Sequence, residues 1–173
     1  ALPRQLTDRE PISSSRIRKL VEEGEMEEAR HLLGRPYTLR GKVVPGRRLG
    51  REMGFPTLNI PYAPETRPRF GVYFAGLLAP DGKTVLPGIV NYGRKPTVEK
   101  DSAPLLEVHL LAVPGEGPPG QGNDLCVFLL DFLRPEKAFD GVEALREQIT
   151  RDVATAHRLA REGRHLQATE TMT

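Results

Sequence analysis

Short apolar runs, separated by turns rich in glycine and proline, dominate the chain from Tyr37 onward. Runs of this length and spacing predict β-strands. We expect six of them, at residues 37–44, 55–60, 70–78, 84–90, 105–111 and 125–133. Asp81-Gly82, between the third and fourth runs, is a strong hairpin signal. Because no helical segments alternate with these strands, the pattern favours an antiparallel barrel or sandwich over a parallel sheet.

Two short helices are predicted before the first strand. Serines at positions 13–15 stand where a helix N-cap would lie, and Leu20 and Val21 give that helix a modest apolar face. Gly24 and Gly34 have the positions of C-terminal stops. Because two such helices can bury little surface, we interpret residues 1–35 as a helical appendage and residues 36–173 as the main domain.

A longer amphipathic helix is predicted near the end of the chain. Asp140 and Glu143 have the spacing of a capping box. Apolar residues then recur at helical spacing on one face, at Val142, Leu145, Ile149, Val153 and Ala156. We expect this stripe to lie across the barrel, as a packing helix without chemistry of its own.

Composition and charge narrow the classes of function. The chain has 173 residues, enough for one domain and a short appendage, and its formal net charge is only +2. This charge gives no argument for a nucleic-acid or membrane partner. A single cysteine, Cys126, excludes an internal disulfide framework and suits a reducing compartment. With no secretory leader and no apolar run of membrane-spanning length in the sequence, we expect a cytoplasmic location.

Two pairs of polar residues are candidates for chemistry. If residues 57–60 are extended, Thr57 and Asn59 share one face and offer two oxygen ligands of the kind that Mg²⁺ prefers. Taken alone, both could equally satisfy turn hydrogen bonds. Glu107 and His109 project together from an apolar strand, and a carboxylate in such a run either pairs with a cation or acts as a base. We expect His109 to be a strand residue with a satisfied ring and not a ligand.

The loop between Gly46 and Gly54 has glycines at every fourth position and three arginines. Glycines allow backbone N–H groups to approach a phosphate, and arginines supply charged donors, although many such loops are plain turns. Gly82-Lys83-Thr84 ends like a phosphate-binding P-loop. The earlier glycine of that pattern is Leu77 here, and the tripeptide lies in a predicted hairpin, so we reject this assignment.

Several short blocks of the sequence, which occur in the family's order, together resemble the signature of riboflavin kinases. They cover about three-quarters of the chain. These blocks are residues 41–46, 50–60, 71–73, 91–97, 107–111 and 133–139. The resemblance implies a mostly β fold, a six-stranded antiparallel Greek-key barrel with a long C-terminal helix. It also implies transfer of phosphate from ATP to riboflavin with Mg²⁺, giving FMN and ADP.

The resemblance also assigns roles to residues. Thr57 and Asn59 would bind the magnesium ion and the ATP phosphates, and Glu107 would take the proton from the terminal ribityl hydroxyl. The nucleotide loop would contain Gly46, Arg51 and Gly54. The flavin would be bordered by residues 133–139, in particular Leu133, Arg134 and Phe139, by the loop after Leu111 and by the start of the final helix.

Two departures from the family pattern concern residues near the expected site. Leu58 replaces the small alanine that usually stands between the threonine and the asparagine, and we expect little harm because its side chain faces away. The usual acidic-aromatic-glycine turn after the catalytic strand is replaced by the glycine- and proline-rich residues 113–123, so the family's flavin contacts from that turn do not carry over to this loop.

The N-terminal segment is similar to the junction in bacterial bifunctional FAD synthetases, where an adenylyltransferase domain precedes the kinase. We therefore expect residues 1–35 to be a remnant of such a domain, and we expect no formation of FAD by this chain. A non-catalytic flavin- or nucleotide-binding barrel is one alternative. The other is an RNA-binding barrel that uses Arg47, Arg48 and Arg51, although aromatic residues are only 6% of the chain and the charge is nearly balanced.

Overall fold

The structure is a computed structural model that describes residues 6–7, 10–46, 49–94, 103–112 and 122–168. The residues outside this description include Arg47, Arg48, positions 95–97 of the block at 91–97, and most of the predicted loop at 113–123. Six main strands follow one another along the chain: β3 (Tyr37–Lys42), β4 (Leu58–Pro61), β5 (Gly71–Leu78), β6 (Val85–Gly93), β7 (Leu105–Leu110) and β8 (Asp124–Pro135).

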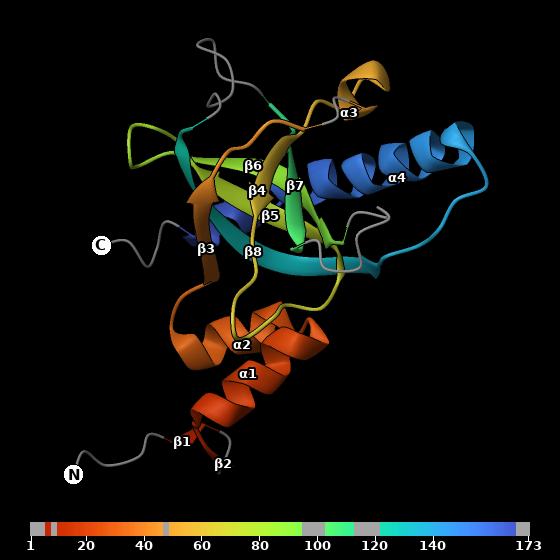
Figure 1. The fold of residues 1–173 in the computed structure, drawn as a ribbon. Helices are drawn as coiled ribbons and strands as arrows, with labels where there is room; N and C mark the ends of the chain where they lie inside the picture. Colours follow the sequence, from red (N-terminus) through yellow and green to blue (C-terminus); the bar gives the residue numbers. More distant parts are fainter. Residues whose placement is uncertain (1–5, 8–9, 47–48, 95–102, 113–121, 169–173) are drawn as a thin grey trace.

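The six strands form one antiparallel sheet in the order β3-β8-β5-β6-β7-β4. The two edge strands meet at a bridge between Val44 and Asn59, which nearly closes the sheet into a barrel (Figure 1). The predicted six-stranded antiparallel barrel is therefore confirmed. The fourth predicted strand ends later than expected, because β6 continues through Gly93. The second begins later, because Pro56 cannot donate a ladder hydrogen bond and β4 starts at Leu58.

The two faces of the sheet are covered by different partners. The inner face forms the main apolar core of the barrel, which includes Leu39, Tyr73, Val90 and Val108. On the outer face, helix α4 (Val142–Arg161) and the short 3₁₀ helix η1 (Arg164–Ala168) cover a second cluster that includes Phe74, Ile89, Phe128, Leu130 and Ala156. Side chains that alternate along a strand therefore belong to two separate layers.

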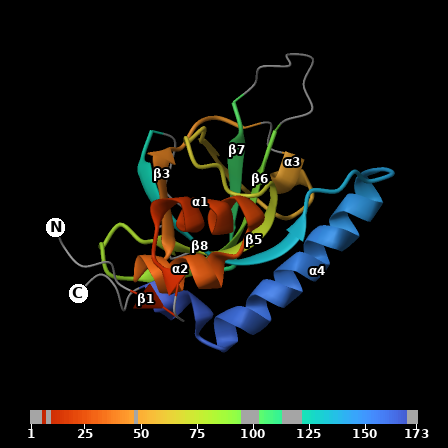
Figure 2. The ribbon, with the colours of Figure 1, turned by 90° about the horizontal axis from the view of Figure 1, so that it is seen from below.

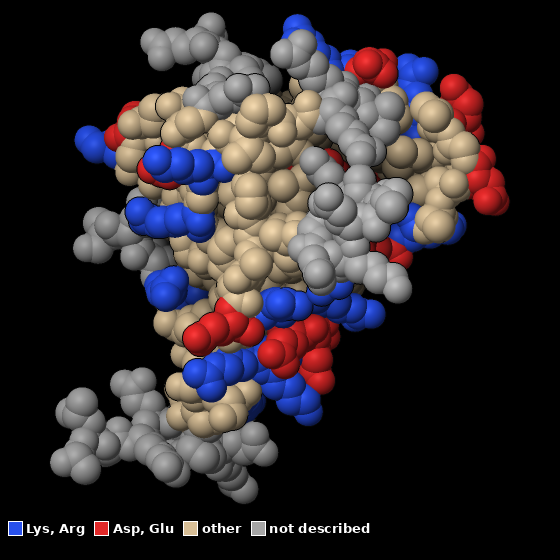
Figure 3. All heavy atoms as spheres, in the orientation of Figure 1, with Lys and Arg blue, Asp and Glu red and all other residues tan. Residues whose placement is uncertain are grey.

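The N-terminal helices α1 (Ser14–Glu23) and α2 (Met26–Leu33) lie across one end of the barrel (Figure 2). The predicted caps are confirmed: the Ser13 side chain accepts a hydrogen bond from the Arg16 amide, and Gly24 and Gly34 end their helices with left-handed backbone angles. On the face shown in Figure 3, charged side chains of both signs gather over these helices. A two-residue pair, β1 (Leu6–Thr7) with β2 (Glu10–Pro11), precedes them.

The expectation that these helices bury little surface was wrong. Their apolar side chains belong to the same core cluster as the barrel interior, and five of them are buried: Leu20, Val21, Met26, Ala29 and Leu32. The end of the barrel offers an apolar surface against which both helices pack. Short helices can therefore bury their apolar side chains there. The division of the chain at residue 35 stays a prediction.

The predicted capping box of the last helix is also wrong. Gly141, with φ of 105°, is the N-cap residue of α4, and no side chain caps the helix. Asp140 therefore lies one residue too early for the box. Val142 is 55% exposed, whereas Ala156 is buried, so only the second half of the helix packs fully against the barrel. The first half extends beyond the sheet (Figures 1 and 2).

The hairpin at residues 79–84 is confirmed and is held by Asp81. One oxygen of its carboxylate accepts the amide hydrogens of Lys83 (2.9 Å) and Thr84 (2.8 Å), and the other accepts the Thr84 hydroxyl hydrogen. Gly82-Lys83-Thr84 thus belongs to a turn between β5 and β6 and not to a phosphate-binding P-loop. Among the described residues, no helix has both the length and the apolar character needed to cross a bilayer.

Candidate active site

A single row of side chains crosses five strands on the outer face of the sheet. In the antiparallel registers, Asn59 of β4 lies opposite Glu107 of β7, which lies opposite Asn91 of β6. Asn91 in turn lies opposite Val72 of β5, and Val72 lies opposite Arg134 of β8. Directly opposed residues have Cβ atoms about 5 Å apart, so the sheet itself fixes the spacing of this row.

This row forms the floor of a cavity of about 420 Å³. Both predicted pairs, Thr57 with Asn59 and Glu107 with His109, contribute to its lining. One wall comes from the segment around the short helix α3 (Leu49–Glu52), with Gly50, Met53 and Phe55. The opposite wall comes from residues 136–139 and from Leu145, Ile149 and Asp152 of α4. Residues far apart in sequence therefore share one site, in the volume range of small-molecule clefts.

Asn59 is a buried polar residue of the sheet. Only 6% of it is exposed, and its carbonyl oxygen accepts a hydrogen bond from the Val44 amide (2.9 Å). Gly46 lies against its side-chain amide, since a Cβ at position 46 would overlap the Asn59 nitrogen and lie 2.8 Å from Cγ. In the described part of the chain, no protein group hydrogen-bonds to that amide. Asn59 is not among the described residues that have a fully buried polar atom without a partner, so its amide atoms reach the open space of the cavity, where a ligand can meet them.

Glu107 lies on the floor of the cavity, between Asn59 and Asn91. Among the described residues, no lysine, arginine or histidine forms a salt bridge with it. A second carboxylate, Glu136, lines the same cavity, and burial, followed by the charge of Glu107, raises the pKa of Glu136 above its ordinary value. Gly93 leaves the space that the Glu136 carboxylate occupies, because any Cβ at position 93 would collide with it.

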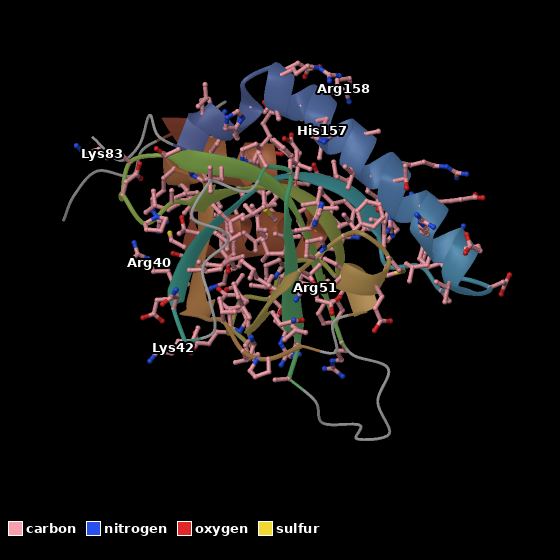
Figure 4. All side chains as sticks on the ribbon, turned by 90° about the horizontal axis from the view of Figure 1, so that it is seen from above. Arg40, Lys42, Arg51, Lys83, His157 and Arg158 are labelled. Atoms are coloured by element: carbon pink, nitrogen blue, oxygen red, sulfur yellow. The ribbon has the colours of Figure 1, made fainter. Side chains whose placement is uncertain are left out.

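The predicted nucleotide loop is only partly at the cavity. Gly46 touches Asn59, and Gly50 lines the cavity near Thr57, where a Cβ on Gly50 would lie 3.4 Å from the Thr57 hydroxyl. Arg51 is exposed on α3 (Figure 4). It is not one of the residues that line the cavity. Gly54, with φ of 87°, makes the turn that follows α3, and it is not a lining residue either.

The predicted flavin-side residues divide in the same way. Arg134 and Phe139 line the cavity, whereas Leu133 packs against the apolar cluster under α4. The Arg134 guanidinium donates to both oxygens of the buried Asp152, with Nε 3.0 Å from Oδ1 and Nη2 2.7 Å from Oδ2. The Gln148 amide donates to the same carboxylate at 2.9 Å. Arg134 therefore joins β8 to α4 and also borders the cavity.

Three lining residues were not given individual roles from the sequence, although Asn91 and Glu136 lie within the blocks that carry the family resemblance. Asn91 stands inside an apolar strand in the same way as Glu107, and that signal could have found it. Glu136 carries no periodic signal, because it follows Pro135 at the end of β8. Asp152 is a polar residue on the packed face of α4, and this position inside an apolar stripe was a detectable sign of pairing.

The site offers oxygen ligands for a hard cation. Thr57, Asn59 and Glu107 provide hydroxyl, amide and carboxylate oxygens on one face. The described residues contain no group of three or more histidine, cysteine, aspartate or glutamate side chains that could hold a metal ion by themselves. The donor set therefore fits Mg²⁺ that keeps several ligands from water and from a bound phosphate.

Comparison with known proteins identifies the family of the chain. The family model described as riboflavin kinase (flavokinase) matches residues 33–160. The bifunctional riboflavin kinase/FMN adenylyltransferase of Pseudomonas fluorescens is 36% identical over 154 residues, which are 89% of this chain and 48% of that protein. The protein of the same name from Escherichia coli K12 is 39% identical over 145 residues, which are 84% and 45% of the two chains. The chain thus spans about half the length of these curated relatives.

Two solved structures are similar to the chain. One, described as a macrolide-efflux protein from Streptococcus pneumoniae, has a TM-score of 0.77 and 29% identity, and the match covers 90% of this chain and 50% of that one. Riboflavin kinase from Trypanosoma brucei has a TM-score of 0.52 and 20% identity over 79% of this chain and 87% of that one, which shows a shared fold. Together with the family match, these findings confirm the resemblance: the chain belongs to the riboflavin kinase family, a family of phosphotransferases, and corresponds to the kinase module of its bifunctional relatives.

Proposed function

We propose that this chain transfers the terminal phosphoryl group of ATP to the ribityl 5′-hydroxyl of riboflavin, with Mg²⁺, to give FMN and ADP. The single observation that carries the proposal is the register pair of Asn59 and Glu107. It places an amide oxygen suited to a metal-bound phosphate directly across from a carboxylate suited to deprotonate a hydroxyl. The proposed reaction is supported by family membership, and its proposed location is supported by the row of side chains.

Glu107 is the proposed general base. As the riboflavin hydroxyl oxygen attacks the terminal phosphorus, the Glu107 carboxylate accepts the hydroxyl proton, and ADP leaves with the electrons of the broken phosphorus–oxygen bond. The absence of a paired cation among the described residues leaves this carboxylate able to accept a proton. Glu136 lines the same cavity, and burial, followed by the charge of Glu107, raises the pKa of Glu136 above its ordinary value.

Thr57 and Asn59 are the proposed holders of Mg²⁺, which when bound would neutralise phosphate charge and orient the phosphate oxygens. The backbone next to these residues is shaped by Gly46 and Gly50, neither of which has room for a side chain. Such glycines allow phosphate groups to approach the main chain closely. Arg51, exposed on α3, would add positive charge at the rim, and Gly54 would shape the turn beside it.

The flavin ring is proposed to lie on the side of the cavity next to α4. The lining there is largely apolar, with Val72, Ile89, Phe139, Leu145 and Ile149. A flat aromatic ligand loses little by leaving water for such a surface. This placement would bring the ribityl chain towards Glu107, which lies between Asn59 and Asn91 in the row.

Two rival functions remain to be tested against this proposal. A non-catalytic flavin- or nucleotide-binding barrel would bind its ligand in the same cavity and would leave Glu107 without a chemical role. An RNA-binding barrel would need an extended basic surface. The charges in Figure 3 are of both signs, and Arg47 and Arg48 are outside the described residues, so no observation favours that rival.

The experiment mixes the purified chain with riboflavin, ATP and Mg²⁺ and separates the flavins by chromatography. We expect FMN from the wild-type chain, and no FMN after EDTA is added. Glu107→Gln should lose at least about a hundredfold of kcat, a typical contribution of a general base, with an unchanged circular dichroism spectrum. Riboflavin binding without any FMN in the wild-type chain would establish the non-catalytic rival.

The relatives carry a second activity in the remainder of their length, so we propose that this chain is joined to an FMN adenylyltransferase domain in a longer protein of the same kind. The chain tested alone should then form FMN from riboflavin but no FAD from FMN and ATP. FAD formation by these 173 residues would contradict this assignment. A cytoplasmic location, where ATP and free flavin are available, goes with the proposal.

A further inference from the structure

The residues just before β4 need support from outside the sheet. The last register pair that joins β4 to β7 is Leu58 with Val108, so Pro56 and Thr57 lie beyond the ladder. Pro56 has no N–H group and can bind only through its carbonyl oxygen. The Thr57 hydroxyl, which the proposed function assigns to the metal and phosphates, therefore stands on a segment that sheet hydrogen bonds do not fix.

His109 supplies that support from the neighbouring strand. Its ring nitrogen Nδ1 lies 2.9 Å from the Pro56 carbonyl oxygen. Because a carbonyl oxygen only accepts, Nδ1 must carry the hydrogen and donate it. The edge of the Phe55 ring also meets the His109 ring, with centroids 5.6 Å apart and an interplanar angle of 80°. One histidine thus contacts two consecutive residues of the unsupported segment.

The segment is held on its other side by α3. The Phe55 amide donates to the Gly50 carbonyl oxygen at 2.6 Å. Residues 55–57 are therefore fixed between the α3 turn and β7, with Thr57 at the end that reaches the cavity. The same face of β7 carries both Glu107 and His109, so a single strand places the proposed base and one of the two supports.

We propose that His109 is a positioning residue for phosphoryl transfer: its Nδ1–H holds the Pro56 carbonyl and so sets the Thr57 hydroxyl beside Asn59 and Glu107. This inference rests on the proposed kinase function, which gives Thr57 its role. The imidazole acts through the backbone of its neighbour and takes no proton from substrate. A displacement of about 1 Å at a positioning group can cost about a hundredfold in rate, so one hydrogen bond is enough to matter.

Two variants distinguish the effect of the Nδ1 hydrogen bond from the effect of losing the imidazole ring. In His109→Asn the amide nitrogen replaces Nδ1, whereas in His109→Gln it replaces the more distant Nε2. We expect His109→Asn to retain kcat/KM for ATP within about threefold, and His109→Gln to lose about tenfold or more, as expected for a lost hydrogen bond and a displaced ligand. KM for riboflavin should change little in either variant, and the pH profile should keep its shape.

Two measurements do not depend on turnover. Nitrogen-15 NMR of the histidine-labelled wild-type chain should show the tautomer with hydrogen on Nδ1 of His109. Calorimetry with Mg²⁺ and a non-hydrolysable ATP analogue should show weaker binding for His109→Gln than for His109→Asn, with equal riboflavin binding. Circular dichroism melting of both variants checks that each folds.

The outcomes of these experiments support or overturn the positioning role of His109. Retained activity and analogue binding in His109→Gln would overturn the proposal, and so would an Nε2–H tautomer in the wild type. Equal losses in both variants, with an altered pH profile, would show that the ring acts on substrate and would also overturn it. If the wild-type chain makes no FMN, the kinase function itself fails, whereas the tautomer result still reports on the contact with Pro56.

Discussion

Gly46 offers a direct test of how closely the site is built, because its substitution should damage catalysis without damaging the fold. A Cβ at position 46 would overlap the Asn59 amide nitrogen and lie 2.8 Å from Cγ, whereas ordinary contact begins at 3.4 Å. The Asn59 side chain or the loop must therefore move by at least about 0.6 Å. The Asn59 backbone cannot follow easily, because it is bonded to Val44 and paired with Glu107.

For Gly46→Ala we expect kcat/KM for ATP to fall by about ten- to a hundredfold, since misplacement of about 1 Å can cost that much. The backbone of Gly46 is not left-handed, so alanine adds no strain there. Initial rates of FMN formation, with ATP varied at saturating riboflavin and then the reverse, measure the effect. The loss should appear in the ATP series.

The matched control is Gly82→Ala in the hairpin between β5 and β6. There φ is 68° and a Cβ meets no atom within 4 Å, so the substitution strains the backbone by about 1 kcal/mol but touches nothing. We expect Gly82→Ala to unfold more easily in urea and keep its rate, the opposite of Gly46→Ala. Wild-type kcat/KM in Gly46→Ala would refute the idea that Asn59 must stay in place.

Two further predictions concern stability. Asp152→Ala leaves the Arg134 guanidinium, whose side chain is 20% exposed, without its carboxylate, and should lower the free energy of unfolding by about 3 kcal/mol in urea titrations. The control, Glu147→Ala, removes the partner of the exposed Arg151 in the same helix and should lower it by at most about 0.5 kcal/mol. Equal losses of stability in the two variants would contradict the pairing argument. Hydrogen bonds from the Thr84 hydroxyl and from two amides lower the pKa of Asp81 from 3.8 to about 2. Ionised Asp81 therefore stabilises the fold above the unfolded value, and this contribution is lost as the pH falls towards 2. The difference in melting temperature between the wild type and Asp81→Ala should shrink between about pH 4 and pH 2, and a constant difference would refute the assignment.

The sequence predicted the features that depend on local pattern. Alternation along residues 105–110 placed Glu107 and His109 on one face, and the structure has both in the same cavity. Turn residues such as Asp81-Gly82 predicted where strands meet, because their backbone preferences are local. The riboflavin kinase resemblance, carried by short blocks in a fixed order, is confirmed by the family match.

Features that depend on distant partners were not predictable in this way. The opposition of Asn59 and Glu107 depends on which strands pair, and residues 59 and 107 are far apart in the chain. The burial of Met26 and Val21 depends on the open end of the barrel, which a helix pattern does not describe. The failed capping box shows the converse, because Asp140 had the right spacing but Gly141 took the N-cap position.

Alternate side chains of a strand face the barrel core and the cavity, and this has a consequence for how the protein can evolve. Along β7, Leu106 and Val108 are fully buried inside the barrel, while Glu107 between them faces the cavity. Substitutions at core-facing positions should thus prevent folding, whereas substitutions at cavity-facing positions should give chains that fold but do not turn over substrate. Substrate preference can drift on one side of the sheet while the other side keeps the barrel intact.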